Sequence, residues 1–118
     1  MAQITNQINA ALPNAFYCAG LVSPNGTVLS STGRDGFTAV LSAAGQYDIT
    51  FATARAGADY PIILTVNDAS GANYDERDDI NARYWLRTTA GFQVRIRRDD
   101  NGSTAGGLFD CEFSFIVL

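Results

Sequence analysis

Apolar residues recur at every second position in short runs along most of the chain, and the last run is the most regular. From Phe109 to Val117 every odd-numbered residue is Phe, Cys or Val, and the residues between them include Asp110, Glu112 and Ser114. Successive side chains of a β-strand point to opposite faces of the sheet. This period therefore predicts a strand with one apolar face.

Seven further runs have an alternating or β-branched pattern, and clusters of Gly, Asn, Asp and Ser separate them. Three separators, "SPNG" (23–26), "AAGQ" (43–46) and "TAGF" (89–92), place a glycine where a tight turn favours a positive φ. Short strands between such turns are typical of an all-β sandwich or barrel. The expected strands cover 15–22, 27–31, 37–43, 47–53, 61–67, 83–89, 92–98 and 109–117, with long polar loops at 67–82 and 99–107.

The first residues have a different period. Ile4, Ile8 and Leu12 recur every four residues and Pro13 follows, which predicts a short helix or else an extended segment. So short a helix is marginal alone in water, so the stripe must dock on its own domain, on sister subunits or on another protein. We expect an N-terminal anchor or linker at 1–14 and one β-sandwich domain at 15–118, with a disordered leader as the alternative for 1–14.

The composition excludes several kinds of chemistry. The chain of 118 residues has no histidine and no lysine, and all eight of its basic residues are arginine. Imidazole bases, imidazole metal ligands, Schiff-base lysines and Ser-His or Cys-His nucleophiles are therefore absent. No set of residues indicates a catalytic centre or a cofactor, so we expect a non-enzymatic protein.

Charge and hydropathy limit the kinds of partner and the location that we expect for the protein. The net charge of −4 argues against duplex nucleic acid. No run reaches the ~18–20 apolar residues that a membrane span needs, so we expect no membrane insertion. The start, "MAQITNQINAAL", lacks the features of a signal peptide, so we expect synthesis in the cytoplasm. Cys18 and Cys111 fit neither a zinc site nor a CxxC redox motif.

Four acidic residues, Asp75, Glu76, Asp78 and Asp79, surround Arg77 in the expected loop 67–82. Carboxylates on a loop can bind Ca²⁺, but this spacing is not that of an EF-hand. A solvated polar loop without metal is the simpler interpretation, and calcium binding is the alternative.

Trp85 is the second candidate, in "RYWLR" (83–87). Alternation places Tyr84 and Leu86 on one face of the strand and Arg83, Trp85 and Arg87 on the other. A tryptophan flanked by arginines suits a sugar platform or an interface anchor. The reversed phase, with Trp85 in the core, is the alternative.

Charges also link two late strands, "FQVRIRR" (92–98) and "FDCEFSFIV" (109–117). In a direct hairpin Arg97 would oppose Asp110 and Arg95 would oppose Glu112, each pair adding roughly 0.2–1 kcal/mol. The intervening loop is long for a hairpin, so the last strand can equally cross to the other sheet.

Several segments resemble two related sets of jelly-roll domains. The segments are "AFYCAG", "DGFTAVLSAAGQYDITFA", "YPIILTVN", "GFQVRI" and the closing "FDCEFSFIVL". They are similar to the tumour-necrosis-factor-like jelly roll, which includes the globular heads of collagen-tailed complement proteins. They resemble more closely the small carboxy-terminal domains of bacteriophage tail fibres and related virion appendages, over about residues 15–118.

The resemblance implies a jelly-roll-like antiparallel β-sandwich of about eight strands. The last strand would lie in mid-sheet beside the first, and in a homotrimer its sheet can face the three-fold axis. Pairing of the terminal strands would place Cys18 and Cys111 on neighbouring strands, both facing inward. Assembly in a reducing cytoplasm favours free thiols, with a disulfide as the alternative.

The function implied is host attachment. The chain would be a non-enzymatic trimeric virion protein, made in the host cytoplasm, that binds a host surface glycan or outer-membrane protein through loops at one end. Residues 1–14 would join it to other virion proteins. Two alternatives remain, a structural virion protein that decorates the capsid or forms a tail joint, and a cellular lectin-like adhesion module. The candidate ligand contacts are Asn73, Tyr74, Asp75, Arg77, Asp79 and Trp85.

Overall fold

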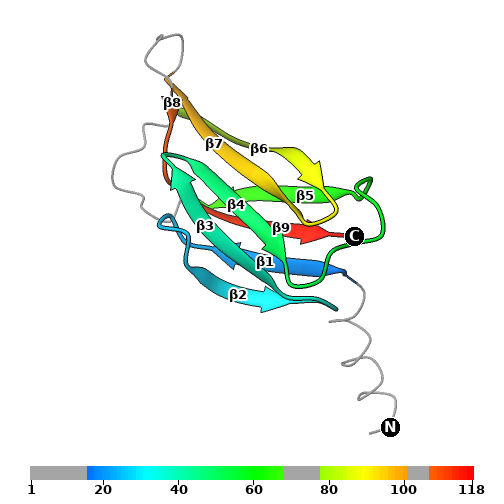
Figure 1. Ribbon diagram of the computed structural model, residues 1–118. Helices are drawn as coiled ribbons and strands as arrows, with labels where there is room; N and C mark the ends of the chain where they lie inside the picture. The colour runs from blue at the N-terminus through cyan, green and yellow to red at the C-terminus, as the bar shows by residue number, and fades with distance from the viewer. Residues whose placement is uncertain (1–15, 68–77, 101–106) are drawn as a thin grey trace, which may run out of the picture.

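The computed structural model describes residues 16–67, 78–100 and 107–118, and this part of the chain is all-β. Nine strands form two antiparallel sheets that pack together, as Figure 1 shows, which confirms the expected β-sandwich. The anchor candidates Ile4, Ile8 and Leu12 lie outside the described residues. The strands are β1 (Cys18–Val22), β2 (Val28–Thr32), β3 (Phe37–Ala43), β4 (Gln46–Phe51), β5 (Ile62–Asn67), β6 (Asp78–Thr88), β7 (Gly91–Asp100), β8 (Gly107–Leu108) and β9 (Glu112–Val117).

The last strand lies inside its sheet, beside the first. The four-stranded sheet has the order β2-β1-β9-β5, and β9 pairs antiparallel with both of its neighbours. Phe115, for example, lies between Gly20 of β1 and Leu64 of β5. The closing strand therefore has the position that the jelly-roll resemblance implied.

The second sheet has the order β3-β4-β7-β6, and β8 pairs with β7 near its end. Because β7 and β9 belong to different sheets, the direct hairpin between them does not form. Arg95 opposes Gln46 in its own sheet, and Glu112 opposes Asn67 in the other. The chain crosses between the sheets after β8, so the arginine–carboxylate pairs of a hairpin are not made.

Strand pairing extends further into one expected loop than the composition suggested. β6 begins at Asp78, because its alternation with β7 continues upstream, with Ala82 opposite the fully buried Ile96. The prediction that 78–82 belongs to a loop is therefore wrong. Asp79 lies in a strand, where it opposes Asp99 of β7.

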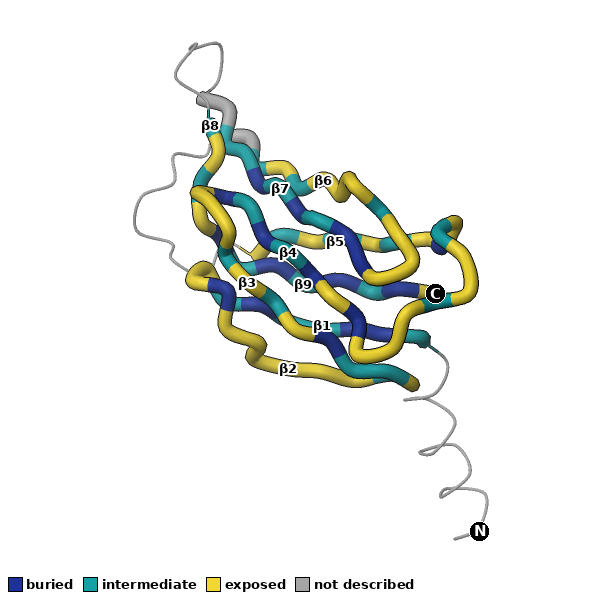
Figure 2. Tube along the Cα trace, in the orientation of Figure 1, coloured by how far each residue is buried: buried dark blue, intermediate teal, exposed yellow. Residues whose placement is uncertain are grey.

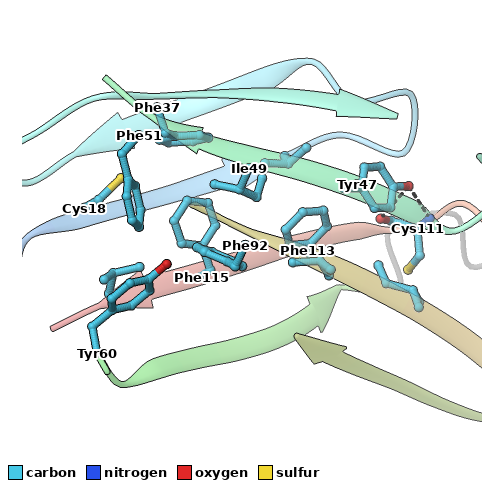
Figure 3. Close-up of a cluster of buried hydrophobic side chains, with 14 residues drawn as sticks. Cys18, Phe37, Tyr47, Ile49, Phe51, Tyr60, Phe92, Cys111, Phe113 and Phe115 are labelled. Carbon is cyan, nitrogen blue, oxygen red and sulfur yellow. Dashed lines mark hydrogen bonds between the residues drawn. The ribbon is translucent and has the colours of Figure 1, made fainter. Parts of the chain in front are cut away.

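Aromatic side chains fill the space between the sheets (Figure 3). Along β9, buried positions alternate with partly exposed ones, as Figure 2 shows. The ring of Phe115 makes edge-on contacts with Phe37 and Phe92, with centroids 4.8 and 5.4 Å away. Such pairs add about 0.5–1.5 kcal/mol beyond the area they bury. The core cluster comprises Cys18, Val22, Phe37, Tyr47, Ile49, Phe51, Tyr60, Phe92, Val94, Ile96, Cys111, Phe113, Phe115 and Val117.

Cys18 and Cys111 are buried free thiols, but they do not lie side by side. Their segments are neighbours, yet Cys18 opposes Val117, six positions beyond Cys111 in the chain. At about 3.4 Å per residue, that offset far exceeds the ~7 Å Cα limit for a disulfide. Both thiols face the core from neighbouring segments, as expected, but antiparallel pairing sets the start of β1 against the end of β9, which excludes the disulfide alternative. Figure 3 shows the two thiols at opposite ends of the core.

One end of the sandwich is closed by stacked arginine and tyrosine side chains. The Arg55 guanidinium carbon lies 4.2 Å from the ring centroid of Tyr17 and 4.9 Å from that of Tyr60. The guanidinium carbon of Arg87 lies 5.7 Å from the ring centroid of Tyr60. Nη1 of Arg55 also donates to the main-chain oxygen of Leu118 at 2.8 Å. These contacts tie the end of β9 to the segment before β5, so we assign Arg55 and Arg87 to the fold.

Candidate recognition site

Trp85 lies on the outer face of the β3-β4-β7-β6 sheet. It opposes Gln93 of β7, whereas the preceding Tyr84 opposes the fully buried Val94. Residues directly opposite in a sheet share a face, so Tyr84 is on the core side and Trp85 points away from the core, 36% exposed. The phase that puts Arg83 and Trp85 outward is confirmed, and the alternative with Trp85 in the core is wrong.

A β-bulge after Trp85 ends this alternation. The register of β6 against β7 shifts between Trp85 and Thr88, and Leu86 has a φ of 49°. A leucine in the left-handed region costs roughly 1–2 kcal/mol. Nη1 of Arg87 donates to the main-chain oxygen of Tyr60 at 2.8 Å, which takes Arg87 away from the outer face. The prediction that Arg87 shares a face with Trp85 is therefore wrong, because the bulge reverses the alternation.

Two contacts hold the guanidinium of Arg95 against Trp85. Its Cζ lies 3.6 Å from the centroid of the Trp85 ring, and its Nε donates to Oε1 of Gln46 at 3.2 Å. Nε2 of Gln46 in turn donates to Oγ of Ser42 at 3.2 Å. Side chains from three strands, β3, β4 and β7, thus form a polar chain that ends on the indole of β6.

A shallow depression of about 270 Å³ lies where β6 turns into β7, lined by Leu86, the chain neighbour of Trp85, and by Gln93, its cross-strand partner. Gly91 and the exposed Leu86 both line it. Nε2 of Gln93 donates to Oδ1 of Asp48 at 2.6 Å at its edge. The other amide atom, Oε1 of Gln93, is buried and accepts no hydrogen bond within the described residues.

The outer face also carries a short row of arginines, which the register continues into Asp79 opposite Asp99. Arg83 lies directly opposite Arg95, and Arg97 follows two positions further along β7. Like charges directly opposite in a sheet are destabilising. Among the side chains that the structure describes, the one ion pair joins Arg87 to Asp59 at 3.4 Å, so none involves this row.

The outer face of the β2-β1-β9-β5 sheet has a different character. Ile63 of β5, 51% exposed, lies beside Ile116 of β9, which lies beside Ala19 of β1. Leu21, two residues after Ala19 in β1, lies on the same face. Ser114 and Thr65 lie in the same row as Leu21, and acidic Glu112 stands at the end of β9. The middle of this face is therefore uncharged, with one row of aliphatic residues and one of mixed character.

Most of the ligand contacts expected from the long loop fall outside the described residues: Asn73, Tyr74, Asp75 and Arg77. The calcium alternative falls largely on the same segment. In the remainder of the chain no group of three or more acidic, cysteine or histidine side chains is placed to hold a metal ion. That same portion also contains no helix long and apolar enough to cross a membrane.

Sequence reasoning found Trp85 and Arg83 but missed their companions on β4 and β7. Asp48, Gln93 and Arg95 come together with Trp85 through the cross-strand register. The alternation in 92–97 shows that Gln93 and Arg95 share one face of their strand. It does not show which strands lie beside that strand.

Two groups with strongly raised pKa values belong to the core rather than to this face. Burial raises the pKa of Cys18 from 9.0 to about 12, and it raises the pKa of Tyr47 from 10.0 to about 12. Both groups therefore stay protonated and unreactive at neutral pH. Their role is in packing.

No protein-family model, curated protein or solved structure matches this chain.

Proposed function

We propose that the chain is a non-enzymatic homotrimeric recognition module of a bacteriophage virion appendage such as a tail-fibre tip. The outer face of the β2-β1-β9-β5 sheet would pack between subunits. The outer face of the opposite sheet, centred on Trp85, would bind the host surface, a glycan or an outer-membrane protein.

The observation that carries this proposal is the contrast between the two outer faces. One sheet presents Ile63, Ile116 and Leu21 beside the small uncharged residues Ser114 and Thr65, and an uncharged face of this kind can be buried against a copy of itself. The other presents a partly exposed tryptophan under a fixed arginine. Tryptophan and arginine are the residue types most enriched at binding hot spots. The number three comes from the resemblance to tail-fibre and tumour-necrosis-factor-like domains.

Residues 1–14 complete the proposal as the attachment to the virion. Three large aliphatic side chains, Ile4, Ile8 and Leu12, would each contribute ~1.5–3 kcal/mol if buried at the base of the trimer. The recognition face would then point toward the host and the N-terminal end toward the particle.

Binding to cells tests this function. Fluorescently labelled protein should bind some members of a panel of bacteria, and Trp85→Ala should reduce the bound fluorescence about tenfold or more without changing the subunit number. Val40→Ala is the matched control, because Val40 is an exposed apolar residue, 57% exposed, on the same sheet face but on the edge strand β3. It should bind like the wild type.

Two outcomes would count against host recognition. If Trp85→Ala binds cells as the wild type does, this face is scaffold. If the wild type binds no cell but co-purifies with capsids or tails, the structural alternative, a decoration or joint protein, takes its place.

A further inference from the structure

Arg95 presents a preorganised fork of donors on the outer face. Its Nε donates to Gln46, and its guanidinium plane lies against the Trp85 ring. The two terminal nitrogens, Nη1 and Nη2, make no hydrogen bond in the described part of the chain. Neither nitrogen is buried, because the one buried and unbonded side-chain atom in that part is Oε1 of Gln93. A planar guanidinium held in this way matches the two oxygens of a carboxylate or sulfate, and little rotamer entropy is lost on binding.

The surrounding charges favour an anion at that fork. Arg83 directly opposes Arg95 and Arg97 lies next to it on β7, in a chain whose net charge is −4. The same-phase pair that follows Arg97 is acidic, Asp79 opposite Asp99, so the positive charge is confined to the three arginines. Folding brings two like charges together across the strands at a cost, and a bound anion between them would offset that cost.

The groups beside the fork suit a sugar ring. Trp85 remains partly exposed, and the adjoining depression offers an apolar wall at Leu86 and polar groups at Asp48, Thr50 and Gln93. Hydroxyl, amide and carboxylate groups around an apolar surface can bind the hydroxyls and the carbon face of one pyranose. At about 270 Å³ the depression is slightly smaller than the ~300–1,000 Å³ of pockets that enclose drug-sized ligands.

We propose that this face binds an acidic saccharide, with the carboxylate or sulfate of the sugar on Arg95 and Arg83 and its ring in the depression beside Trp85. This inference rests on the proposed recognition function and names its ligand class. A long nucleic acid or acidic peptide fits less well, because the depression has a volume of only about 270 Å³ and so accommodates a compact group.

The strained Leu86 supports the same assignment. Its positive φ is uncommon for a bulky residue, and it keeps an apolar side chain, 60% exposed, at the wall of the depression. Strain retained at a surface position is often associated with a functional site.

Direct titration tests the ligand class. The probes are a galacturonic acid trimer, the same trimer fully methyl-esterified, a sulfated galactose trimer and neutral lactose, each titrated into the full chain by isothermal calorimetry. The galacturonate or the sulfated trimer should bind at least about tenfold more tightly than the neutral probes, because only they engage the arginine fork with charge-assisted bonds. Affinity should fall as salt rises from about 50 to 500 mM. Which anionic probe binds better distinguishes a carboxylate site from a sulfate site.

Variants separate this site from a structural role. Arg95→Lys keeps the charge but loses the fork, and it should weaken anionic binding about tenfold. Arg83→Gln should weaken binding several-fold while leaving the melting temperature unchanged or higher, because it removes the like-charge pair. Arg34→Gln is the matched control, an exposed arginine that follows β2 at the edge of the other sheet, 5.8 Å from the Tyr17 ring centroid, and it should change neither property.

The results that would overturn the inference differ from those that would overturn the proposed function. Equal binding of the galacturonate and its methyl ester, or unchanged binding by both Arg95→Lys and Arg83→Gln, would exclude the anionic site. If no saccharide binds while cells are still bound through Trp85, recognition stands and its ligand is not a saccharide of this class.

Discussion

Gly91→Ala is expected to lose most of its folded population. A Cβ at this position would lie 1.9 Å from the main-chain oxygen of Ile49, the closest approach at any described glycine. Gly91 also has a positive φ of 156°. The obstructing atoms belong to the backbone of β4, which pairs with β7 along this stretch, so they cannot rotate away. We expect a loss of at least about 4 kcal/mol, a large share of the 5–15 kcal/mol of a typical domain.

Gly57→Ala is the matched control for that variant. A Cβ at Gly57 would meet no atom within 4 Å, and its φ is not in the left-handed region. The same methyl addition should therefore be neutral or stabilise by about 0.4–1 kcal/mol, through the unfolded state. Urea unfolding followed by tryptophan fluorescence measures both variants. A Gly91→Ala protein as stable as the wild type would contradict the register between β4 and β7.

Tyr47→Phe should cost about 2–4 kcal/mol at neutral pH. The buried hydroxyl donates to the main-chain oxygen of Pro24 at 2.7 Å, and it accepts from the main-chain nitrogen of Cys111 at 3.1 Å. It therefore ties the turn after β1 to the segment that enters β9. Removing it leaves backbone groups unsatisfied, at about 1–3 kcal/mol for each buried group. Tyr84→Phe, which removes an exposed hydroxyl from a tyrosine 38% exposed, should be neutral.

The same variant changes the response to alkaline pH. Burial raises the pKa of Tyr47 from 10.0 to about 12 and that of Cys18 from 9.0 to about 12. Because both folded-state values are raised, their contribution is fully present below about pH 9 and is lost as the pH rises toward 12. Wild-type stability should fall steeply between about pH 9 and 11.5 in the presence of a reductant. Tyr47→Phe should fall less steeply above about pH 10, and parallel curves would contradict the assignment of that titration to Tyr47.

The period of apolar residues was sufficient to predict the fold class, because strands with one buried face must alternate. It placed the apolar face of β9 correctly, but it left two phases open for Trp85, and the register with β7 decides between them. It failed where pairing partners decide the structure. Residues 78–82 read as a polar loop, yet β7 extends alongside them and draws them into β6. The separation of Cys18 from Cys111 likewise follows from strand direction, which composition does not encode.

The recognition face shows the same limit at the level of side chains. Trp85 was identifiable as an unusual residue, but its contact with Arg95 depends on which strand lies beside β6. The bulge at Leu86 also has no signal in "RYWLR", since leucine is not a residue that favours a positive φ. Side chains brought together across three strands become visible only once the register is known.

The division of the sandwich into a self-association face and a recognition face is the central claim, and the mass of the assembly in solution tests it most directly. Light scattering after size exclusion at micromolar concentration should give three times the chain mass of 12.6 kDa for the wild type. Ile63→Arg, on the apolar face, should give the single-chain mass, whereas Val40→Arg, at a comparably exposed position of the other sheet, should remain trimeric. A monomeric wild type, or an assembly that Val40→Arg disrupts and Ile63→Arg leaves intact, would contradict the account.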